Sequence, residues 1–291
     1  MRKVFISITV LLFVLILILP FISIVFGAFQ NGVGPVIQAF KRPEAIHALT
    51  VTFIITVIVV ILNAVIGVIL SLEIVRGKWI PKWLHSFINI MIDLPFSVSP
   101  VIGGLMIILL FGPTTVLGMF FENIGFKIVF ALPGMVMATV FVTFPLMVRE
   151  IVPVLSELGT SSEEASATLG AGPVRTFFQI TLPSIRWAVY YGLVLTIARS
   201  VGEFGAVLVV SGNIINQTQT ATTLVYQDSV NNNIVAADSV ALLLGILSIL
   251  VLLVLEWMKN RKEGRVYAYR GKKFRKALWS ISSGQPSKFS N

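Results

Sequence analysis

Long apolar stretches alternate with short polar segments along most of this chain. A helix needs about 20 apolar residues to cross the hydrocarbon core of a bilayer, which is ~30 Å thick. Six stretches reach that length, at about 4–27, 49–72, 86–110, 128–148, 187–210 and 235–257. The pattern therefore predicts an all-α, polytopic membrane protein with six transmembrane helices.

Composition supports this prediction and excludes a water-soluble fold. Of the 291 residues, 56% are hydrophobic and 12% are charged, whereas soluble domains carry about 25% charged residues. The first apolar stretch follows Arg2 and Lys3, as in a signal peptide. It is longer than the 7–15 residues of a signal-peptide core, and no small-x-small cleavage site follows. We therefore expect a retained anchor.

The basic residues are distributed unevenly between the two sides that the spans define. With the N-terminus inside, only Lys41, Arg42 and Lys127 fall outside, and the run Lys259–Lys276 falls inside. Because cytoplasmic loops carry the excess of Lys and Arg, we expect both termini and the 157–183 loop to be cytoplasmic. The placement of the net charge of +9 indicates membrane topology rather than a nucleic-acid surface.

Two regions are expected. Residues 1–258 form a transmembrane permease-like domain, and residues 259–291 form a basic cytoplasmic tail with too few apolar residues for a core. Such a tail can anchor electrostatically to anionic lipid heads. The 28–48 segment is expected to carry a short interfacial helix.

Prolines fall inside the third and fourth apolar stretches. Pro95, Pro100 and Pro113 mark the third, and Pro133 and Pro145 the fourth. Proline removes a backbone donor and clashes one turn back, so these helices should kink or be interrupted. Freed carbonyls are tolerated at membrane depth when they face protein or a water-filled cavity. The breaks therefore mark either a transport pathway or a simple change of helix tilt.

The most polar internal segment reads EASATLGAGPVRTFFQITLP and cannot be another span. Its spacing is Glu-Ala, four residues, Gly, nine residues and Ile-x-Leu-Pro, carried by Glu164, Ala165, Gly170, Ile180, Leu182 and Pro183. Ser161-x-x-Glu164 matches a capping box at a helix start. Gly170 is placed to end that helix, and a second helix is expected from about 174 to 180. The segment is either a docking loop or a plain surface hairpin.

The fifth stretch contains charges at membrane depth, in the string ARSVGEFGA. Each such charge costs roughly 2.5–3.5 kcal/mol on insertion scales. Arg199 and Glu203 are four apart, so they can share a helix face and neutralise each other. Gly202 and Gly205 permit close helix approach. A pathway or gate and a buried structural ion pair both fit this pattern, and Asp93 and Pro95 of the third stretch are further pathway candidates.

The polar segment resembles the EAA loop of bacterial ABC importer permeases, which docks into an ATPase subunit; Ser166 stands where that family usually has a second Ala. The strings LPFSVSPVIGGLMIILLFG, PGMVMATVFVTFPLMVRE and ARSVGEFGAVLVVSGNI extend the resemblance over about residues 86–215. The chain thus resembles MetI-like permeases, and among them the CysW type for sulfate or thiosulfate. The ModB type, for molybdate, is a close relative.

This resemblance implies partners for the chain in a bacterial cell (inner) membrane. They are a CysA-like ATPase that binds the ATP, an extracellular or periplasmic sulfate-binding protein, and a second permease, either CysT-like or another copy. The resemblance assigns ATPase coupling to the six loop residues. It leaves a molybdate or tungstate importer open as an alternative.

The sequence itself lacks the motifs of catalysis. It has no cysteine, two histidines and no G-x-x-x-x-G-K-[ST] phosphate loop. These absences predict a non-catalytic subunit without a cofactor or metal site of its own. A self-powered secondary anion transporter, with Arg199, Glu203 and Asp93 as an ion relay, is the alternative from another class. It leaves the EAA-like loop unexplained.

Overall fold

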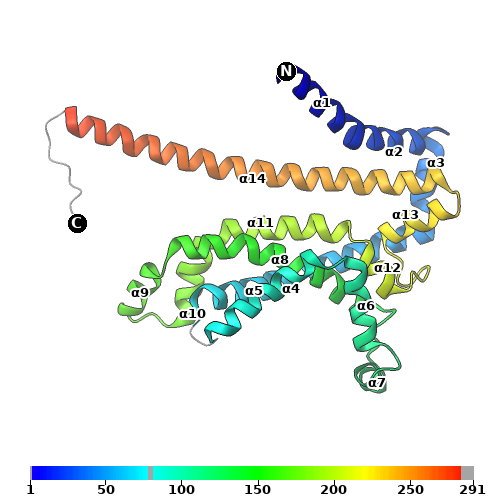
Figure 1. Cartoon of the computed structure of the whole chain (residues 1–291), viewed down its shortest axis with the longest axis horizontal. Helices are drawn as coiled ribbons and strands as arrows, with labels where there is room; N and C mark the ends of the chain where they lie inside the picture. The colour runs from blue at the N-terminus through cyan, green and yellow to red at the C-terminus, as the bar shows by residue number, and fades with distance from the viewer. Residues whose placement is uncertain (1, 78–80, 283–291) are drawn as a thin grey trace. The chain divides into compact units, whose positions relative to one another are not determined.

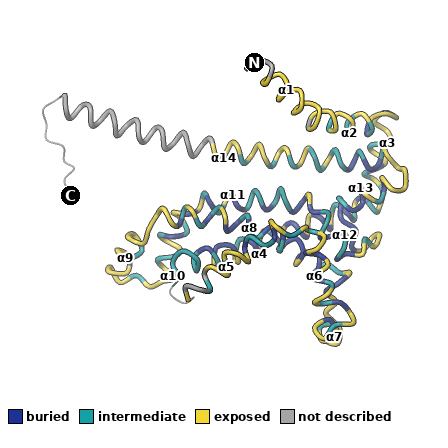
Figure 2. Tube along the Cα trace, viewed as in Figure 1, coloured by how far each residue is buried: buried dark blue, intermediate teal, exposed yellow. Residues whose placement is uncertain are grey.

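The computed structural model describes residues 2–77 and 81–282, and every regular element in these ranges is a helix. The first apolar stretch forms α1 (Arg2–Phe13) and α2 (Leu19–Phe29), joined by a π-helical turn at Val14–Ile18. The expected short helix follows as α3 (Val33–Lys41). The most apolar part of Phe5–Phe29 has no buried residue, so this span has little contact with the rest of its own chain (Figure 2).

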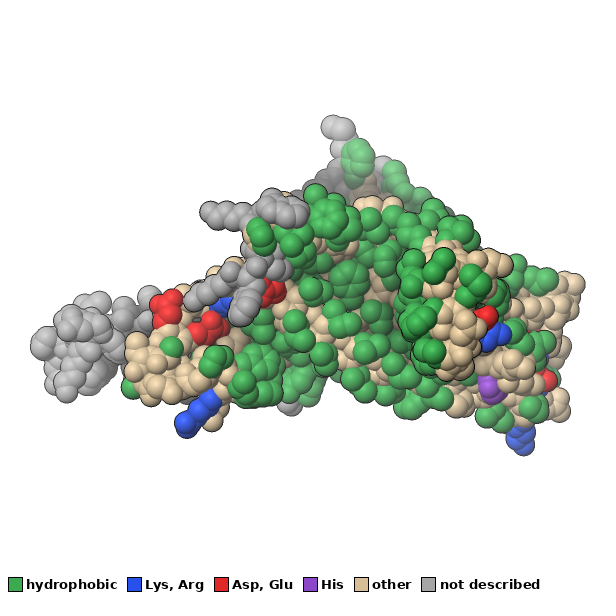
Figure 3. Space-filling model, turned by 90° about the horizontal axis from the view of Figure 1, so that it is seen from below, with side chains coloured by type: hydrophobic (Ala, Val, Ile, Leu, Met, Phe, Trp, Pro, Cys, Tyr) green, Lys and Arg blue, Asp and Glu red, His purple; other side chains and the backbone are tan. Residues whose placement is uncertain are grey.

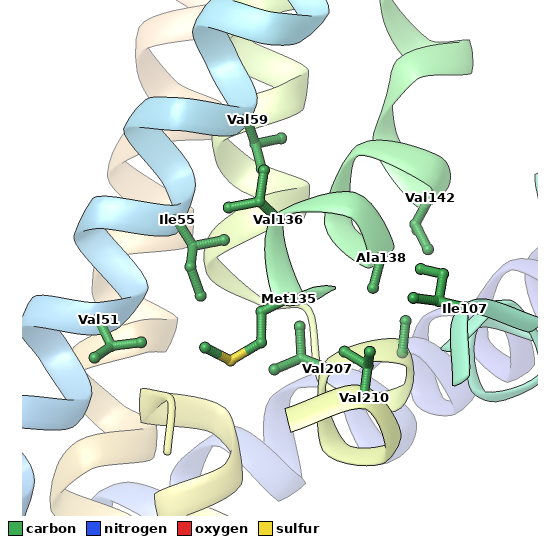
Figure 4. Packing of buried hydrophobic residues seen from close by; sticks show 11 residues of the cluster. Val51, Ile55, Val59, Ile107, Met135, Val136, Ala138, Val142, Val207 and Val210 are labelled. Atoms are coloured by element: carbon green, nitrogen blue, oxygen red, sulfur yellow. The ribbon is translucent and has the colours of Figure 1, made fainter. Parts of the chain in front are cut away.

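Three long helices pack side by side and form the centre of the fold (Figure 1). They are α4 (Pro43–Arg76), α8 (Leu132–Leu158) and α11 (Leu182–Val201), and each has a proline in its first turn, where a missing N–H costs nothing. The main core cluster joins two of them, α4 and α8, to α6 and α12 (Figure 4). It comprises Val51, Ile55, Val59, Ile107, Met135, Val136, Ala138, Val142, Ala206, Val207 and Val210.

A methionine fills the space between these three helices. Met147 of α8 is fully buried. A Cβ added to Gly67 of α4 would lie 2.4 Å from Met147 Cγ, and one added to Gly192 of α11 would lie 2.4 Å from Met147 Sδ. The two glycines therefore make room for one unbranched side chain, and close approach of small residues is what membrane helix packing uses.

The third predicted span is divided into two helices, as its prolines predict. Helix α5 (Lys82–Ser97) and helix α6 (Pro100–Phe111) are separated by extended residues. The segments Ser86–Ser97 and Pro100–Phe111 meet at a bend of 114°. Pro100 favours this break because proline pushes the preceding residue, Ser99, out of the helical region. Helix α7 (Val116–Asn123) follows α6.

The fourth span does not show the expected interruption. Helix α8 continues through Pro145 and Pro153. Each proline removes a single backbone hydrogen bond. The neighbouring buried residues Val142 and Met147 belong to core clusters that hold both sides of the helix in place.

The fifth span differs from the predicted range of 187–210. Its helical path begins with α10 (Pro173–Thr176), passes a π-helical turn at Phe177–Thr181 and continues as α11 to Val201. Gly202 ends α11, and a separate short helix, α12 (Gly205–Ser211), follows. Helix α13 (Ala221–Val230) then packs its Ala221 and Leu224 against Ala45 and Ala48 of α4.

The last helix, α14 (Ile234–Ser282), contains the sixth apolar stretch, Ile234–Lys259. The chain divides into one unit of residues 1–248 and another of residues 249–291. By length and composition, five described helices can cross a membrane, and the bent α5–α6 pair can count as a sixth crossing. The boundary at residue 258 and the role of the basic tail stay predictions.

Apolar side chains also cover much of the surface. On the face in Figure 3 they fill the broad middle, and acidic and basic side chains gather toward the two sides. Exposed large residues include Phe26, Leu109 and Val116, which are 75%, 69% and 81% exposed. A surface of this kind requires lipid or a protein partner rather than water.

Candidate functional site

The polar segment after α8 forms the expected helical hairpin. Helix α9 (Ser161–Thr168) is followed by a turn, by α10 and by the π-helical turn that leads into α11. Figure 1 shows α9 and α10 together at one end of the central helices. The hairpin is thus directly continuous with two of them, α8 before it and α11 after it.

Gly170 ends α9 in the way the sequence predicts. Its φ is +82°, a left-handed conformation that glycine adopts without penalty. The Gly170 N–H bonds to Ala167 O at 3.0 Å and the Ala171 N–H to Ser166 O at 3.1 Å, which is the Schellman arrangement. A Cβ at Gly170 would meet nothing within 4 Å. The backbone conformation, and not lack of space, therefore selects glycine here.

The predicted capping box is wrong. The helix is preceded by Thr160, which makes no side-chain cap, and the Glu164 N–H bonds to the Thr160 carbonyl. The capping box requires Ser161 to precede the helix, but Ser161 is its first residue. Glu164 is therefore the fourth helical residue and not the third, which is the position that caps. Glu164 and Ala165 are exposed instead.

The neighbouring Glu163, which the sequence reasoning missed, ties the hairpin to the membrane helices. Arg76 at the end of α4 donates from Nε to Glu163 Oε2 at 2.9 Å and from Nη2 to the Gly159 carbonyl at 2.6 Å. Thr181 donates to Glu163 Oε1 at 2.9 Å. One carboxylate therefore joins α9 to the end of α4 and to the start of α11.

Ser166, the departure from the family pattern, lies inside the hairpin. It is 8% exposed, and its hydroxyl is 3.0 Å from the Thr176 hydroxyl of α10. A hydroxyl at this position therefore links the two helices of the hairpin, which an alanine could not do.

The remaining motif residues lie where the segment joins α11, whereas other residues form its tip. Leu182 packs, together with Phe177, against the buried cluster around Met147. Ile180 is half-buried and Pro183 is exposed at the start of α11. At the tip, Leu169, Val174 and Phe178 are 88%, 72% and 61% exposed. These three form an apolar tip on an otherwise polar hairpin.

A cavity of about 440 Å³ opens beside α9. It is lined by Leu72, Glu73, Arg76, Thr160, Glu163, Glu164 and Ala167. Three of these residues are acidic and one is basic, so the cavity is suited to a cationic or amide side chain from outside this chain.

The charges of the fifth stretch meet, though not on one helix as predicted. Helix α11 ends at Val201, so Glu203 lies beyond it. Arg199 Nη1 and Glu203 Oε2 are nevertheless 2.9 Å apart, and the Glu203 side chain is 1% exposed. Glu203 Oε1 accepts the Ala206 N–H at 2.9 Å, and Thr222 donates to its backbone carbonyl. The carboxylate thus stabilises the start of α12 as well as pairing with Arg199.

The two predicted glycines lie at the same break. Gly202 is the residue at which α11 ends, and Gly205 begins α12. A Cβ on Gly205 would be 3.1 Å from Val101 Cγ2, and one on Gly104 would be 2.5 Å from the Ala206 carbonyl oxygen. The first turns of the two short helices α6 and α12 therefore lie against each other next to Glu203.

Asp93 and Pro95 belong to a different place. Pro95 is buried within α5. Asp93 pairs with Arg149 of α8, whose Nε donates to Oδ1 at 3.0 Å and whose Nη2 donates to both carboxylate oxygens. The structure thus does not join Asp93 to Arg199 and Glu203. Arg149 lies within α8, toward its C-terminal end.

A further ion pair lies at the other end of α4. Arg42 donates to both oxygens of Asp228 on α13, at 3.0 and 2.5 Å. This hydrogen bonding raises the pKa of Arg42 above its usual value, against the lowering effect of burial. The pair fixes α13 to the start of α4. In residues 2–77 and 81–282 no cluster of three or more metal-ligating side chains occurs.

Comparisons with known proteins agree with this geometry. The family described as "Binding-protein-dependent transport system inner membrane component" matches residues 63–266. The sulfate transport system permease protein CysW of Synechocystis sp. is 42% identical over 248 residues, which cover 85% of this chain and 89% of that protein. CysW of Escherichia coli is 38% identical over 263 residues and covers 89% of each chain. CysT of Synechocystis sp. is 31% identical over 261 residues.

Solved structures with the same fold are also found. A bacterial ABC transporter involved in the import of the acidic polysaccharide alginate matches with a TM-score of 0.73 and 16% identity, over 89% of this chain and 95% of that one. An alginate ABC transporter in complex with its alginate pentasaccharide-bound periplasmic protein matches with the same TM-score. At this identity the likeness shows the fold alone.

Proposed function

Because this chain belongs to the family of inner membrane components of binding-protein-dependent transport systems, we propose that it is the permease subunit of an ATP-driven importer for sulfate or thiosulfate. The observation that carries the substrate is the identity of 42% and 38% to two CysW proteins over more than four-fifths of the chain. The subunit itself is non-catalytic, and its task is to form the pathway and to couple it to a motor.

The hairpin of α9 and α10 is the proposed site of that coupling. Its apolar tip of Leu169, Val174 and Phe178 is exposed, and apolar anchors of this kind supply most of the affinity of a docking surface. The occupant is the ATPase subunit, which binds the ATP. The exposed Glu164 and the acidic cavity beside α9 offer it charged contacts.

The other partners follow from the same proposal. A CysT-like permease or a second copy of this chain completes the pathway, and an external sulfate-binding protein delivers the anion. The complex lies in a bacterial inner membrane with both termini in the cytoplasm. The apolar surface of α1, α2, α6 and α7 leaves room for a neighbouring permease and for lipid.

Arg199 and Glu203 are the proposed outer contacts of the pathway. Moving a dianion through an apolar medium without compensation is prohibitively costly. Arg199 supplies positive potential on α11, where its side chain is 39% exposed. Glu203, which is almost fully buried, limits that potential and holds the guanidinium in place.

Uptake of radioactive sulfate tests the proposal. The chain is expressed with its co-encoded ATPase, second permease and binding protein in cells that lack other sulfate importers. We expect uptake that stops when the ATPase is inactivated. Excess thiosulfate should suppress it, and excess molybdate should leave it unchanged.

Each alternative gives a different result in the same cells. Uptake that continues with an inactive ATPase would identify a self-powered transporter. Uptake that molybdate or tungstate abolishes would replace the substrate while leaving the importer. No sulfate uptake by the complete complex would refute the sulfate assignment.

A further inference from the structure

The ion pair of Asp93 and Arg149 lies on two membrane-spanning elements. Asp93 belongs to α5, the first half of the broken span, and Arg149 belongs to α8. Arg149 precedes the end of α8 at Leu158 by nine residues, which corresponds to about 14 Å along the helix axis. Both residues therefore lie within candidate spans, and Arg149 lies toward the end of α8 that leads to the coupling hairpin.

This pair is exposed although its helix surroundings are apolar. The side chains of Arg149 and Asp93 are 60% and 43% exposed. On α5 the nearby Phe87, Ile90 and Phe96 are also exposed, at 51%, 62% and 57%. Charges that face lipid tails are costly, by roughly 2.5–3.5 kcal/mol each at the centre of a bilayer. The pair therefore faces water or another protein chain.

The geometry of the pair leaves part of the guanidinium outside it. Asp93 accepts from Nε and Nη2, which form one edge of the group. Nη1 carries two more N–H donors, and they lie outside these contacts. Arg149 is thus held in a fixed orientation by a carboxylate while a second donor edge remains.

We propose that Arg149, oriented by Asp93, is an inner contact for the divalent oxyanion on its way to the cytoplasm. This inference rests on the proposed function and adds a second anion contact to it. The outer contact, Arg199, lies 17 residues into α11 from Leu182, or about 26 Å from the hairpin side. The two arginines therefore occupy different depths of the membrane.

The chemistry of the pair suits passage rather than retention. A guanidinium donates two parallel hydrogen bonds to oxyanions, and it remains charged at every physiological pH. The adjacent Asp93 carboxylate neutralises most of its net charge and competes with the anion. An anion at Nη1 is therefore stabilised enough to be desolvated but not enough to be trapped.

The absence of cysteine from the sequence allows a direct test. In the reconstituted complete complex, Arg149→Cys should lower sulfate uptake by about tenfold or more, the scale of losing one charge-assisted contact. Subsequent treatment with 2-aminoethyl methanethiosulfonate places an ammonium at residue 149 and should restore much of the uptake. Methyl methanethiosulfonate, which adds a neutral group, should not.

Matched controls separate this role from a structural one. Arg186→Cys changes another exposed arginine near the hairpin side of a spanning helix, α11, and should respond to neither reagent. The double variant Asp93→Asn/Arg149→Gln removes both charges, so neither is left unpaired. It should still co-purify with its partners and show ATP hydrolysis stimulated by the binding protein, yet import sulfate poorly.

Several results would overturn the inference. They are normal uptake by Arg149→Cys, equal rescue by the neutral reagent, normal uptake by the double variant, and failure of the double variant to assemble. If the unmodified complex moves sulfate in these cases, the proposed function stands without this inference. If the unmodified complex moves no sulfate, the proposed function falls and the inference falls with it.

Discussion

Two adjacent glutamates of α9 have opposite surroundings. Glu163 is bonded to Arg76 and Thr181 of the membrane helices, whereas Glu164 is exposed beside the cavity. The first therefore positions the hairpin within its own chain, and the second remains available to a partner. The motif spacing identified Glu164 alone.

Glu163→Gln should loosen the hairpin, because the charged hydrogen bonds to Arg76 and Thr181 are lost or weakened. The expected loss is about 1–2 kcal/mol of local stability, or roughly 5- to 30-fold faster amide hydrogen exchange in residues 159–181. Glu164→Gln is the matched control and should leave exchange unchanged. Equal exchange in the two variants would contradict the assignment.

Sequence distance explains which pairs could be predicted. Arg199 and Glu203 are four residues apart, so periodicity alone indicated their contact. Glu163 and Arg76 are 87 residues apart, and Arg149 and Asp93 are 56 apart. Such contacts depend on how α4, α5 and α8 pack. None of these four residues carries a local sequence signal of its partner.

At the scale of elements, apolar length predicted the helices, and proline predicted the break between α5 and α6. Neither feature predicted the break at Gly202, because the hydrogen bonds that stabilise this break involve residues beyond α11. Glu203 accepts the Ala206 N–H, and Thr222 of α13 holds the Glu203 carbonyl. The capping box failed for a related reason, since α9 starts at Ser161 and its Glu163 bonds outside the helix.

The packing of Met147 makes the two glycines unequal. A Cβ at Gly67 would lie 2.4 Å from Met147 Cγ and 2.8 Å from Met147 Cβ, an atom that cannot move without the α8 backbone. At Gly192 the nearest atom is Sδ, far along a flexible side chain, and the nearest atom fixed by the α8 backbone is Met147 Cα at 3.2 Å, which is farther than the 2.8 Å to Met147 Cβ at Gly67. Gly67→Ala should therefore lower stability by about 1–3 kcal/mol, and Gly192→Ala by less.

Thermal unfolding of the purified complex in detergent measures this difference. Both variants add one methyl group to a helix, so intrinsic helix propensity changes equally. A lower unfolding temperature for Gly192→Ala than for Gly67→Ala would contradict this prediction.

At the scale of the whole molecule, the sequence predicted an all-helical permease fold, because the apolar stretches and the loop motif are local features. Charged side chains lie toward the two sides of the face in Figure 3, and the excess of basic residues on the cytoplasmic side stays a prediction. The sequence did not predict whether the exposed apolar surface of α2, α6 and α7 contacts lipid or another subunit, since hydropathy does not distinguish these two kinds of contact.

The predicted topology can be checked with single cysteines. In intact cells an impermeant maleimide should label Gln217→Cys, at an exposed position between α12 and α13, and should not label Ala167→Cys, at an exposed position of α9. Permeabilised cells should show labelling at both sites, which controls for reactivity. Labelling of Ala167→Cys alone in intact cells would reverse the orientation.

The continuous helical path from Pro173 to Val201 has a mechanical consequence. Its 29 residues make a rod about 44 Å long, with the apolar tip of the hairpin at one end and Gly202 at the other. An α-helix bends little, so we expect most of any bending to occur at the π-helical turn and at Gly202. A displacement of the hairpin would therefore be transmitted along α11 to the break beside Arg199.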